Sequence, residues 1–171
     1  RSGKLMNSWR DSPNIVQRGI RRLIGAPASA RVLAGTFHHV DRAVSRISGG
    51  RTTAASFFTG LPIITLTTTG AKSGKPRSVP LVGVPDGERL ILIASNWGQA
   101  RHPAWYHNVR ANPEVTVFAE DDPAGRLYGA RELAGEERGA AWARVVRLYP
   151  WYAGYAARSG REIPVVVLEN T

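Results

Sequence analysis

Residues 66–84 read LTTTGAKSGKPRSVPLVGV, and this stretch indicates a β-hairpin. Threonine, valine and leucine on either side are strand formers, whereas the glycines and lysines between them are typical of a turn. Lys72, Lys75 and Arg77 place three cations in or beside that turn. Glycine-rich turns expose backbone amides that bind anions, so the turn is a candidate phosphate or carboxylate site. A solvated hairpin tip is the alternative.

Outward from this hairpin, short apolar segments continue to the end of the chain. They predict about six strands, at 61–69, 78–84, 89–95, 114–120, 126–133 and 163–168, with helices over 102–111 and 136–149 and an aromatic segment at 151–155. The middle of 89–95 is nearly all apolar, which predicts burial on both faces. Most strands are connected by hairpins. An α+β fold with a small closed or split β-barrel therefore fits better than a doubly wound sheet.

The first 60 residues differ from the barrel domain expected over 61–171. They contain 10 basic and 2 acidic side chains, and two amphipathic helices are expected at 13–25 and 28–48. A basic amphipathic helix can lie on an anionic membrane surface. Packing of its apolar stripes on the barrel or on a second copy is the alternative, so a homodimer also stays open.

The composition narrows the class of protein. The 171 residues carry 23 Lys and Arg against 13 Asp and Glu, a net charge of +10, and no cysteine. The charge implies an anionic partner, and the lack of cysteine excludes disulfides and thiolate chemistry. No apolar run is long enough to cross a bilayer and no secretory signal is visible. We therefore expect a cytoplasmic protein, at most peripheral at the inner face of the plasma membrane.

Two further segments carry candidate site residues. Residues 95–103 read SNWGQARHP and lead into a helix whose N-terminus can attract anions or ring carbonyls. Tyr149, Tyr152 and Tyr155 recur every three residues, so they share a helical face that can stack on a planar ligand and offer hydroxyl groups. A capped core helix and an aromatic core seam are the structural alternatives.

Other chemistries are disfavoured by spacing. His38 and His39 are adjacent, and His102 and His107 are five apart, so neither pair has the i, i+4 spacing of a helical metal site and no metal is expected. The sequence contains no Gly-x-Ser-x-Gly motif, so an esterase is not expected. No nucleic-acid reading motif appears, so nucleic acid is not the expected partner.

Three segments, 66–84, 91–117 (ILIASNWGQARHPAWYHNVRANPEVTV) and 148–169 (LYPWYAGYAARSGREIPVVVLE), together resemble the deazaflavin-dependent nitroreductase family of actinobacteria. The resemblance implies the split β-barrel of flavin-binding reductases and coenzyme F420. It also implies hydride transfer from the reduced deazaflavin to an electron-poor acceptor such as a quinone, enone or nitro compound. The acceptor is expected to stack on the ring.

The resemblance also implies where the cofactor binds. Its phosphate and oligoglutamate tail would contact Lys72, Ser73 and Arg77, with flanking backbone contacts from Ser78, Val79, Pro80, Leu81 and Val82. The ring and ribityl chain would meet Ile93, Ala94, Ser95 and Asn96, then Ala104, Trp105, Tyr106, His107 and Asn108. Tyr152 would close the site and is the first candidate proton donor, Tyr155 is the second, and Ser95 would orient the reactants.

This chain departs from the family pattern near the ring. Val82 stands where the pattern has an aromatic residue, Asn96 where it has a lysine, and Trp97 where it has a glycine. Two alternatives to an F420 enzyme remain. An FMN-binding split-barrel protein would need a shorter basic site, and a non-enzymatic module for nucleic acid or lipid would show steeply salt-dependent binding.

Overall fold

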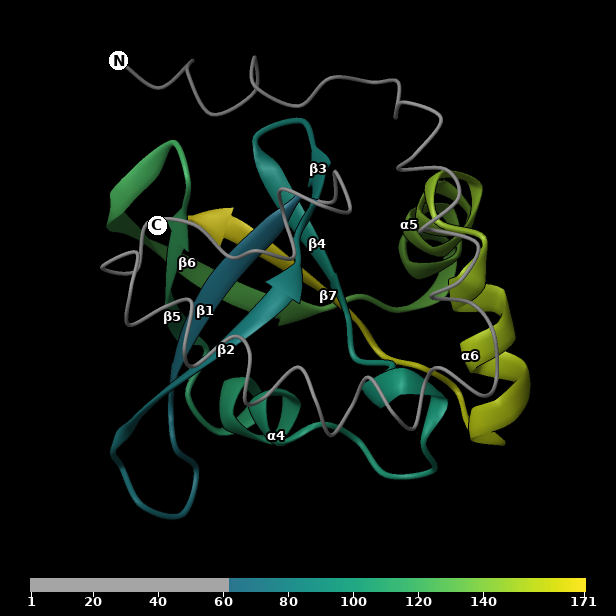
Figure 1. Ribbon diagram of the computed structural model, residues 1–171, viewed down its shortest axis with the longest axis horizontal. Helices are drawn as coiled ribbons and strands as arrows, with labels where there is room; N and C mark the ends of the chain where they lie inside the picture. The colour runs from purple at the N-terminus through teal and green to yellow at the C-terminus, as the bar shows by residue number, and fades with distance from the viewer. Residues whose placement is uncertain (1–61) are drawn as a thin grey trace. The chain divides into compact units, whose positions relative to one another are not determined.

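The computed structural model describes residues 62–171, so the predicted helices of the arm, at 13–25 and 28–48, lie outside the described residues. The described part is an antiparallel sheet with helices packed around it (Figure 1). Its elements are β1 (Ile63–Thr69), β2 (Pro76–Val82), β3 (Val84–Asp86), β4 (Arg89–Ile93), η1 (Asn96–Gly98), α4 (Ala104–Ala111), β5 (Glu114–Ala119), β6 (Asp122–Glu132), α5 (Gly135–Leu148), α6 (Trp151–Ser159) and β7 (Val165–Asn170).

The order of the strands shows that the sheet closes on itself. The order is β2-β1-β5-β6-β7-β4-β3, and β1 with β5, β5 with β6, β6 with β7, β7 with β4 and β4 with β3 pair antiparallel. In a flat sheet the two outermost strands would lie roughly 29 Å apart. Here β2 and β3 are separated in the chain by Gly83 alone, and one residue spans only about 3.5 Å. The sheet must therefore curl, which confirms the predicted split β-barrel.

Gly83 makes this closure sterically feasible. A Cβ atom at position 83 would lie 3.2 Å from both Cδ1 and Cγ2 of Ile64 on β1. Such a distance is tighter than an ordinary van der Waals contact, so a side chain would push against the barrel wall. The absence of one lets the chain leave β2 and enter β3 beside β1.

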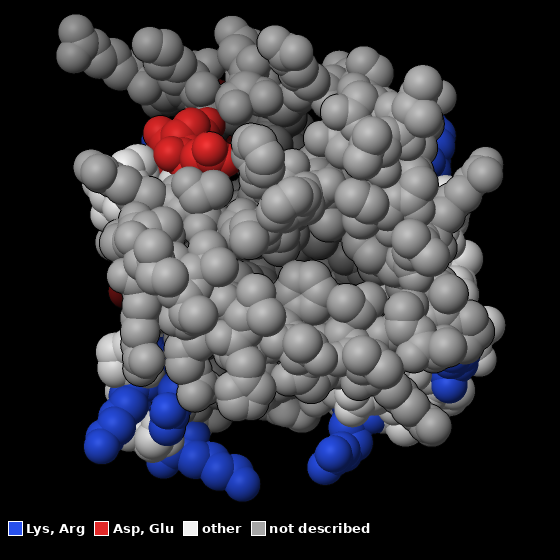
Figure 2. All heavy atoms as spheres, viewed as in Figure 1, with Lys and Arg blue, Asp and Glu red and all other residues white. Residues whose placement is uncertain are grey.

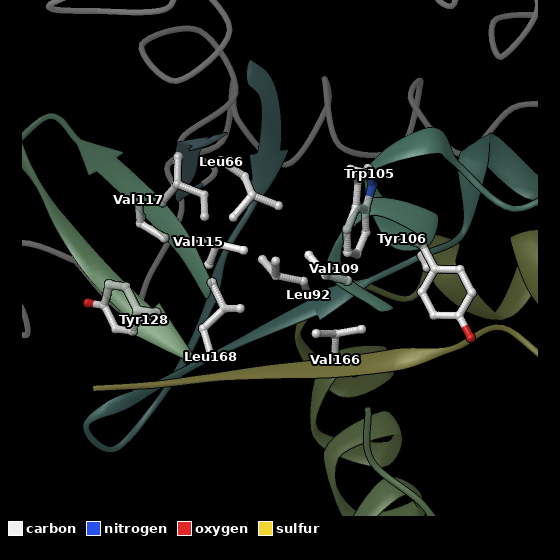
Figure 3. Close-up of a cluster of buried hydrophobic side chains, with 12 residues drawn as sticks. Leu66, Leu92, Trp105, Tyr106, Val109, Val115, Val117, Tyr128, Val166 and Leu168 are labelled. Atoms are coloured by element: carbon white, nitrogen blue, oxygen red, sulfur yellow. The ribbon is translucent and has the colours of Figure 1, made fainter. Parts of the chain in front are cut away.

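The barrel interior is filled by apolar side chains from five strands and from α4 (Figure 3). The cluster consists of Ile64, Leu66, Leu92, Ala94, Trp105, Tyr106, Val109, Val115, Val117, Tyr128, Val166 and Leu168. The neighbours of Leu92 on β4, Ile91 and Ile93, are buried as well. This confirms the prediction that the strand is buried on both faces. On β7, which contacts α5, residues 165–168 are likewise all buried.

Several predicted ends differ by up to four residues, as in β6, which begins at Asp122 and not at 126, and three larger details differ from the expectation. The predicted strand 78–84 is two strands, because the chain bends at Gly83, so the sheet has seven strands. The segment after Pro150 is a helix of its own, α6, since proline is compatible with a helix N-terminus. The predicted loop after β4 contains the short η1 turn. Within residues 62–171 no helix is long and apolar enough to span a membrane.

Candidate functional site

The turn between β1 and β2 presents the cations predicted from the sequence. Lys72, Lys75 and Arg77 are all exposed, and within residues 62–171 none of them forms an ion pair with a carboxylate. Figure 2 shows Lys and Arg side chains projecting at the lower left, where Figure 1 places this turn. The turn is closed by the N–H of Gly70, which donates to the Lys75 carbonyl at 2.9 Å. These cations are therefore available to an external anion.

Asn108 of α4 fixes this turn to the barrel. Its Oδ1 accepts the backbone N–H of Ala71 at 3.0 Å, and its Nδ2 donates to Thr68 Oγ1 at 2.9 Å. Both ends of the amide are thus engaged within the chain. Asn108 therefore holds the turn in place, and its predicted contact with the ligand stays a prediction.

The β2 residues predicted to flank the ligand divide between two environments. Val79 and Leu81 are half-buried and pack against the barrel core. Ser73 and Pro80 are exposed, and Val82 is half-buried. Ser78 is also exposed, and its hydroxyl shares a hydrogen bond with Thr67 Oγ1 at 2.8 Å.

The loop after β4 has an unusual backbone. Ile93, Ala94 and Ser95 are buried, but Asn96 and Trp97 both have positive φ angles, of 47° and 60°. This left-handed region is unfavourable for residues other than glycine, above all for a bulky side chain. The Trp97 side chain nevertheless stays 37% exposed. Strained backbone of this kind is concentrated at functional sites.

Arg161, between α6 and β7, holds this loop. Its guanidinium donates to the carbonyl oxygens of Ala94 at 3.1 Å, Ser95 at 3.3 Å, Gln99 at 3.2 Å and Arg101 at 3.3 Å. Burial lowers the pKa of Arg161. Sequence reasoning missed this residue, because an arginine that bonds only to carbonyl oxygens has no charged partner to reveal it in the sequence.

The residues predicted on α4 also divide. Ala104 and His107 are exposed, whereas Trp105 and Tyr106 are buried and their rings belong to the barrel core, as Figure 3 shows. The Tyr106 hydroxyl donates to Glu132 Oε2 at 2.8 Å, and burial is the main cause that raises the pKa of Tyr106. The two rings therefore pack in the barrel core, and their contact with a ligand stays a prediction.

His102, just before α4, is half-buried, and the sequence predicted no separate role for it within the segment 95–103. Among the described residues its Nδ1 has no hydrogen-bond partner, and its ring lies 4.9 Å from the Tyr106 ring. Burial, followed by the positive charge of Arg161, lowers the pKa of His102. The imidazole is therefore held in its neutral form.

The three predicted tyrosines are all buried. Tyr149, at the end of α5, is 7% exposed, and Tyr152 and Tyr155 on α6 are 6% and 3% exposed. The rings of Tyr152 and Tyr155 meet edge to face at 5.7 Å. Among the described residues the Tyr155 hydroxyl is buried without a hydrogen-bond partner. Burial raises the pKa of Tyr155 to about 12 and raises that of Tyr152 further, so both stay protonated at neutral pH.

The loop after β4 and α6 are brought together at Tyr155. Its ring contacts the Trp97 indole edge-on, with 6.4 Å between the centroids. A Cβ at Gly98 would lie 3.1 Å from the Cα of Tyr155, so the close approach of the two backbones requires glycine. Ser95 and Asn96, which were predicted to contact the ring of the ligand, thus lie beside α6.

These parts follow one another along one side of the barrel. Figure 1 shows, in this spatial order along the lower edge of the view, the β1–β2 turn, α4, the loop after β4 and α6. Within residues 62–171 no hydrogen bond or ring contact joins the turn directly to α6. Cations lie at one end and aromatic side chains with an unpartnered hydroxyl at the other. This arrangement suits a flat ligand with an anionic tail.

Comparisons with known proteins agree on one group. Residues 38–170 match the family model described as F420H(2)-dependent quinone reductase. A relative in Mycobacterium tuberculosis strain H37Rv, named F420H(2)-dependent quinone reductase, is 34% identical over 112 residues, which cover 63% of this chain and 72% of the relative.

Two solved structures are similar as well. One is described as an F420-H2 dependent reductase, FDR-A, with 45% identity and a TM-score of 0.55 over 63% of this chain and 94% of that one. The other is described as a domain-swapped dimer, with 40% identity and a TM-score of 0.58 over 78% of this chain and 99% of that one.

Proposed function

Because the chain belongs to the F420H(2)-dependent quinone reductase family, we propose that it is an oxidoreductase that uses coenzyme F420 to reduce quinones. Two-electron reduction of enones or nitro compounds belongs to the same proposal, since these acceptors are also electron-poor and planar. The observation that carries the proposal is the family match over 38–170, joined to a turn with three unpaired cations in the part of the chain that the structure describes.

The residues present fit this cofactor. Its phosphate and glutamate tail needs cations that are not already neutralised, and Lys72, Lys75 and Arg77 meet that need. Guanidinium and ammonium groups bind carboxylates and phosphates with charge-assisted hydrogen bonds. The ring end would lie near Ser95 and Asn96, where the aromatic side chains of Trp97 and Tyr155 meet.

When bound, reduced F420 would supply a hydride, and a quinone that gains this hydride and one proton becomes a hydroquinone. The chain's own residues align the acceptor, exclude water and provide the proton. The Tyr155 hydroxyl is the donor best supported by its surroundings, because it is buried, protonated and without a partner within residues 62–171. Tyr152, more strongly shifted by burial, is the second candidate, and Ser95 would orient the reactants.

The proposal is tested by titrating the protein with oxidised F420 and following the cofactor fluorescence. We expect saturable binding, and reduced F420 should then be oxidised when menadione is added. A titration with FMN tests the alternative cofactor on the same barrel. Binding of FMN without binding of F420 would overturn the proposal, as would steeply salt-dependent DNA binding with no response to either cofactor.

The cationic turn is tested with the triple variant Lys72→Ala, Lys75→Ala, Arg77→Ala. Loss of three charge-assisted contacts should weaken F420 binding by about 100-fold. The same deazaflavin without its phosphate and glutamate tail should bind to the triple variant with nearly the same affinity as to the wild type. Arg147→Ala, which removes an exposed cation from α5, is the matched control. A loss of about fivefold in the control, which is the share of one charge in a 100-fold effect of three, would mean that only net charge matters.

Lipid binding by residues 1–60 and formation of a homodimer stay predictions, because the arm lies outside the described residues. Flotation with anionic vesicles, with and without the arm, tests the first. Sedimentation equilibrium tests the second.

A further inference from the structure

Trp97 occupies a backbone conformation that would suit a glycine. Its φ of 60° and ψ of 23° are left-handed, and the residue before it, Asn96, is left-handed as well. A glycine would adopt this backbone without strain, whereas a bulky side chain makes it unfavourable. The chain therefore tolerates an unfavourable backbone in order to place an indole at this position.

The surrounding contacts hold the strained loop firmly. Arg161 bonds to carbonyl oxygens at both ends of the loop, including those of Ala94 and Arg101. The Asn96 side chain donates to the same Arg101 carbonyl at 3.0 Å, and the Gly98 N–H donates to the Ser95 carbonyl at 2.9 Å. A conformation fixed from several directions persists in spite of its strain. The position of the indole is thus set by the fold.

The indole is placed where a ligand can reach it. It is 37% exposed, while Tyr155, which it contacts edge-on at 6.4 Å, is only 3% exposed. The Arg158 guanidinium lies over the Tyr155 ring, 5.0 Å from its centre. Trp97 is therefore the exposed flat apolar surface next to the tyrosine that the proposed function uses as proton donor.

We propose that Trp97 is a specificity-determining residue that contacts the flat ring of the electron acceptor and favours bicyclic over monocyclic quinones. The inference rests on the proposed function and adds the acceptor contact. An aromatic pair gains from offset or edge contact in addition to buried area, so a two-ring acceptor gains more from an indole than a one-ring acceptor does. The contact between Trp97 and either acceptor requires no change in the affinity for F420.

The test uses Trp97→Gly, which matches the left-handed backbone, and Trp97→Phe, which keeps one ring. Menadione and p-benzoquinone are titrated by calorimetry into enzyme saturated with oxidised F420, where no turnover occurs. Trp97→Gly should weaken menadione binding about tenfold and p-benzoquinone binding by less than about threefold, with Trp97→Phe in between. The KM values with reduced F420 should shift in the same ratios. Trp142→Phe on α5 is the control.

Several outcomes would overturn the inference. These are unchanged menadione binding in Trp97→Gly, an equal loss for both quinones, or an F420 affinity that falls more than about twofold, which would assign Trp97 to the cofactor. If the wild-type protein binds no F420, the proposed function fails by itself. The menadione titration is then run on the cofactor-free protein, where the same ratio between the wild type and Trp97→Gly supports or refutes the contact.

Discussion

At the scale of single residues, the surroundings of His102 lower its pKa. Its Nδ1 is buried without a partner among the described residues, its ring rests against Tyr106, and the Arg161 guanidinium lies near enough to disfavour a second positive charge. The folded protein therefore binds a proton at His102 less readily than the unfolded chain does. Stability then rises with pH wherever the unfolded state holds more protons.

This pKa shift predicts a pH dependence of unfolding. The contribution of neutral His102 is complete above the ordinary histidine pKa of about 6.5 and declines as pH falls through the lowered pKa. In urea titrations between pH 7.5 and 5, His102→Gln should lose less stability than the wild type on acidification. His107→Gln, with an exposed ring, should keep most of the wild-type slope. Parallel profiles for wild type and His102→Gln would contradict the shift.

Individual residues also show where sequence reasoning reaches its limit. Lys72 and Arg77 could be identified because a glycine-rich turn with cations has a recognisable pattern. Arg161 could not, since its partners are carbonyl oxygens, four of them in a loop some 60 residues earlier in the chain and one at Glu162. For Trp105 and Tyr106 the residue type alone does not distinguish packing in a core from contact with a ligand. Only the fold distinguishes the two environments.

Among the elements, the β1–β2 turn and α4 act as one unit through Asn108. The amide accepts from the Ala71 N–H and donates to Thr68 Oγ1. A cationic turn free to move would lose entropy on meeting an anionic tail, and a turn already held in place avoids that loss. The hairpin and the helix together therefore define the tail end of the site.

Replacing this amide should separate the two elements. Asn108→Ala should lower the free energy of unfolding by about 1–2 kcal/mol, because one partly buried and one exposed hydrogen bond are lost. F420 affinity should also fall, whereas affinity for the tail-free deazaflavin should not. Urea titrations and fluorescence titrations measure the two effects. Asn170→Ala, at the exposed end of β7, is the control. An unchanged F420 affinity would refute the anchoring role.

The elements themselves were mostly predictable. Alternating and apolar runs bounded by glycine and proline identified the strands, and Asn112 with Pro113 marked the end of α4. The three-residue β3 was missed because it continues an apolar run that only Gly83 interrupts. Residues 151–155 were predicted only as an aromatic segment with a helical face. Their place in a separate helix, α6, was not predicted, although a proline such as Pro150 can begin a helix.

At the scale of the whole molecule, the contact between Gly83 and Ile64 is where the barrel closes. Gly83→Ala should lower the free energy of unfolding by about 1–3 kcal/mol, because the added methyl group would press on the Ile64 side chain. Ile64→Val alone should lower it by about 0.5–1.5 kcal/mol. Since the smaller side chain makes room for the methyl group, the double variant should be more stable than the sum of the two changes implies.

Urea denaturation of the four proteins in this cycle measures the coupling. Gly87→Ala tests the general effect of removing a glycine from the barrel, because a Cβ at Gly87 would meet no atom within 4 Å. That position has a φ of 63°, so its change reports backbone strain without a steric contact. Strictly additive losses at Gly83 and Ile64 would show that the closure does not depend on this contact.

The position of β7 has a consequence for biosynthesis. It is the last strand along the described chain, yet it lies inside the sheet between β6 and β4. While a ribosome is still translating the preceding residues, β4 has no partner on the edge that β7 later occupies, and that edge stays open to solvent. Nascent barrels of this topology are therefore exposed to chaperones and to aggregation until residues 165–170 insert and join the two halves.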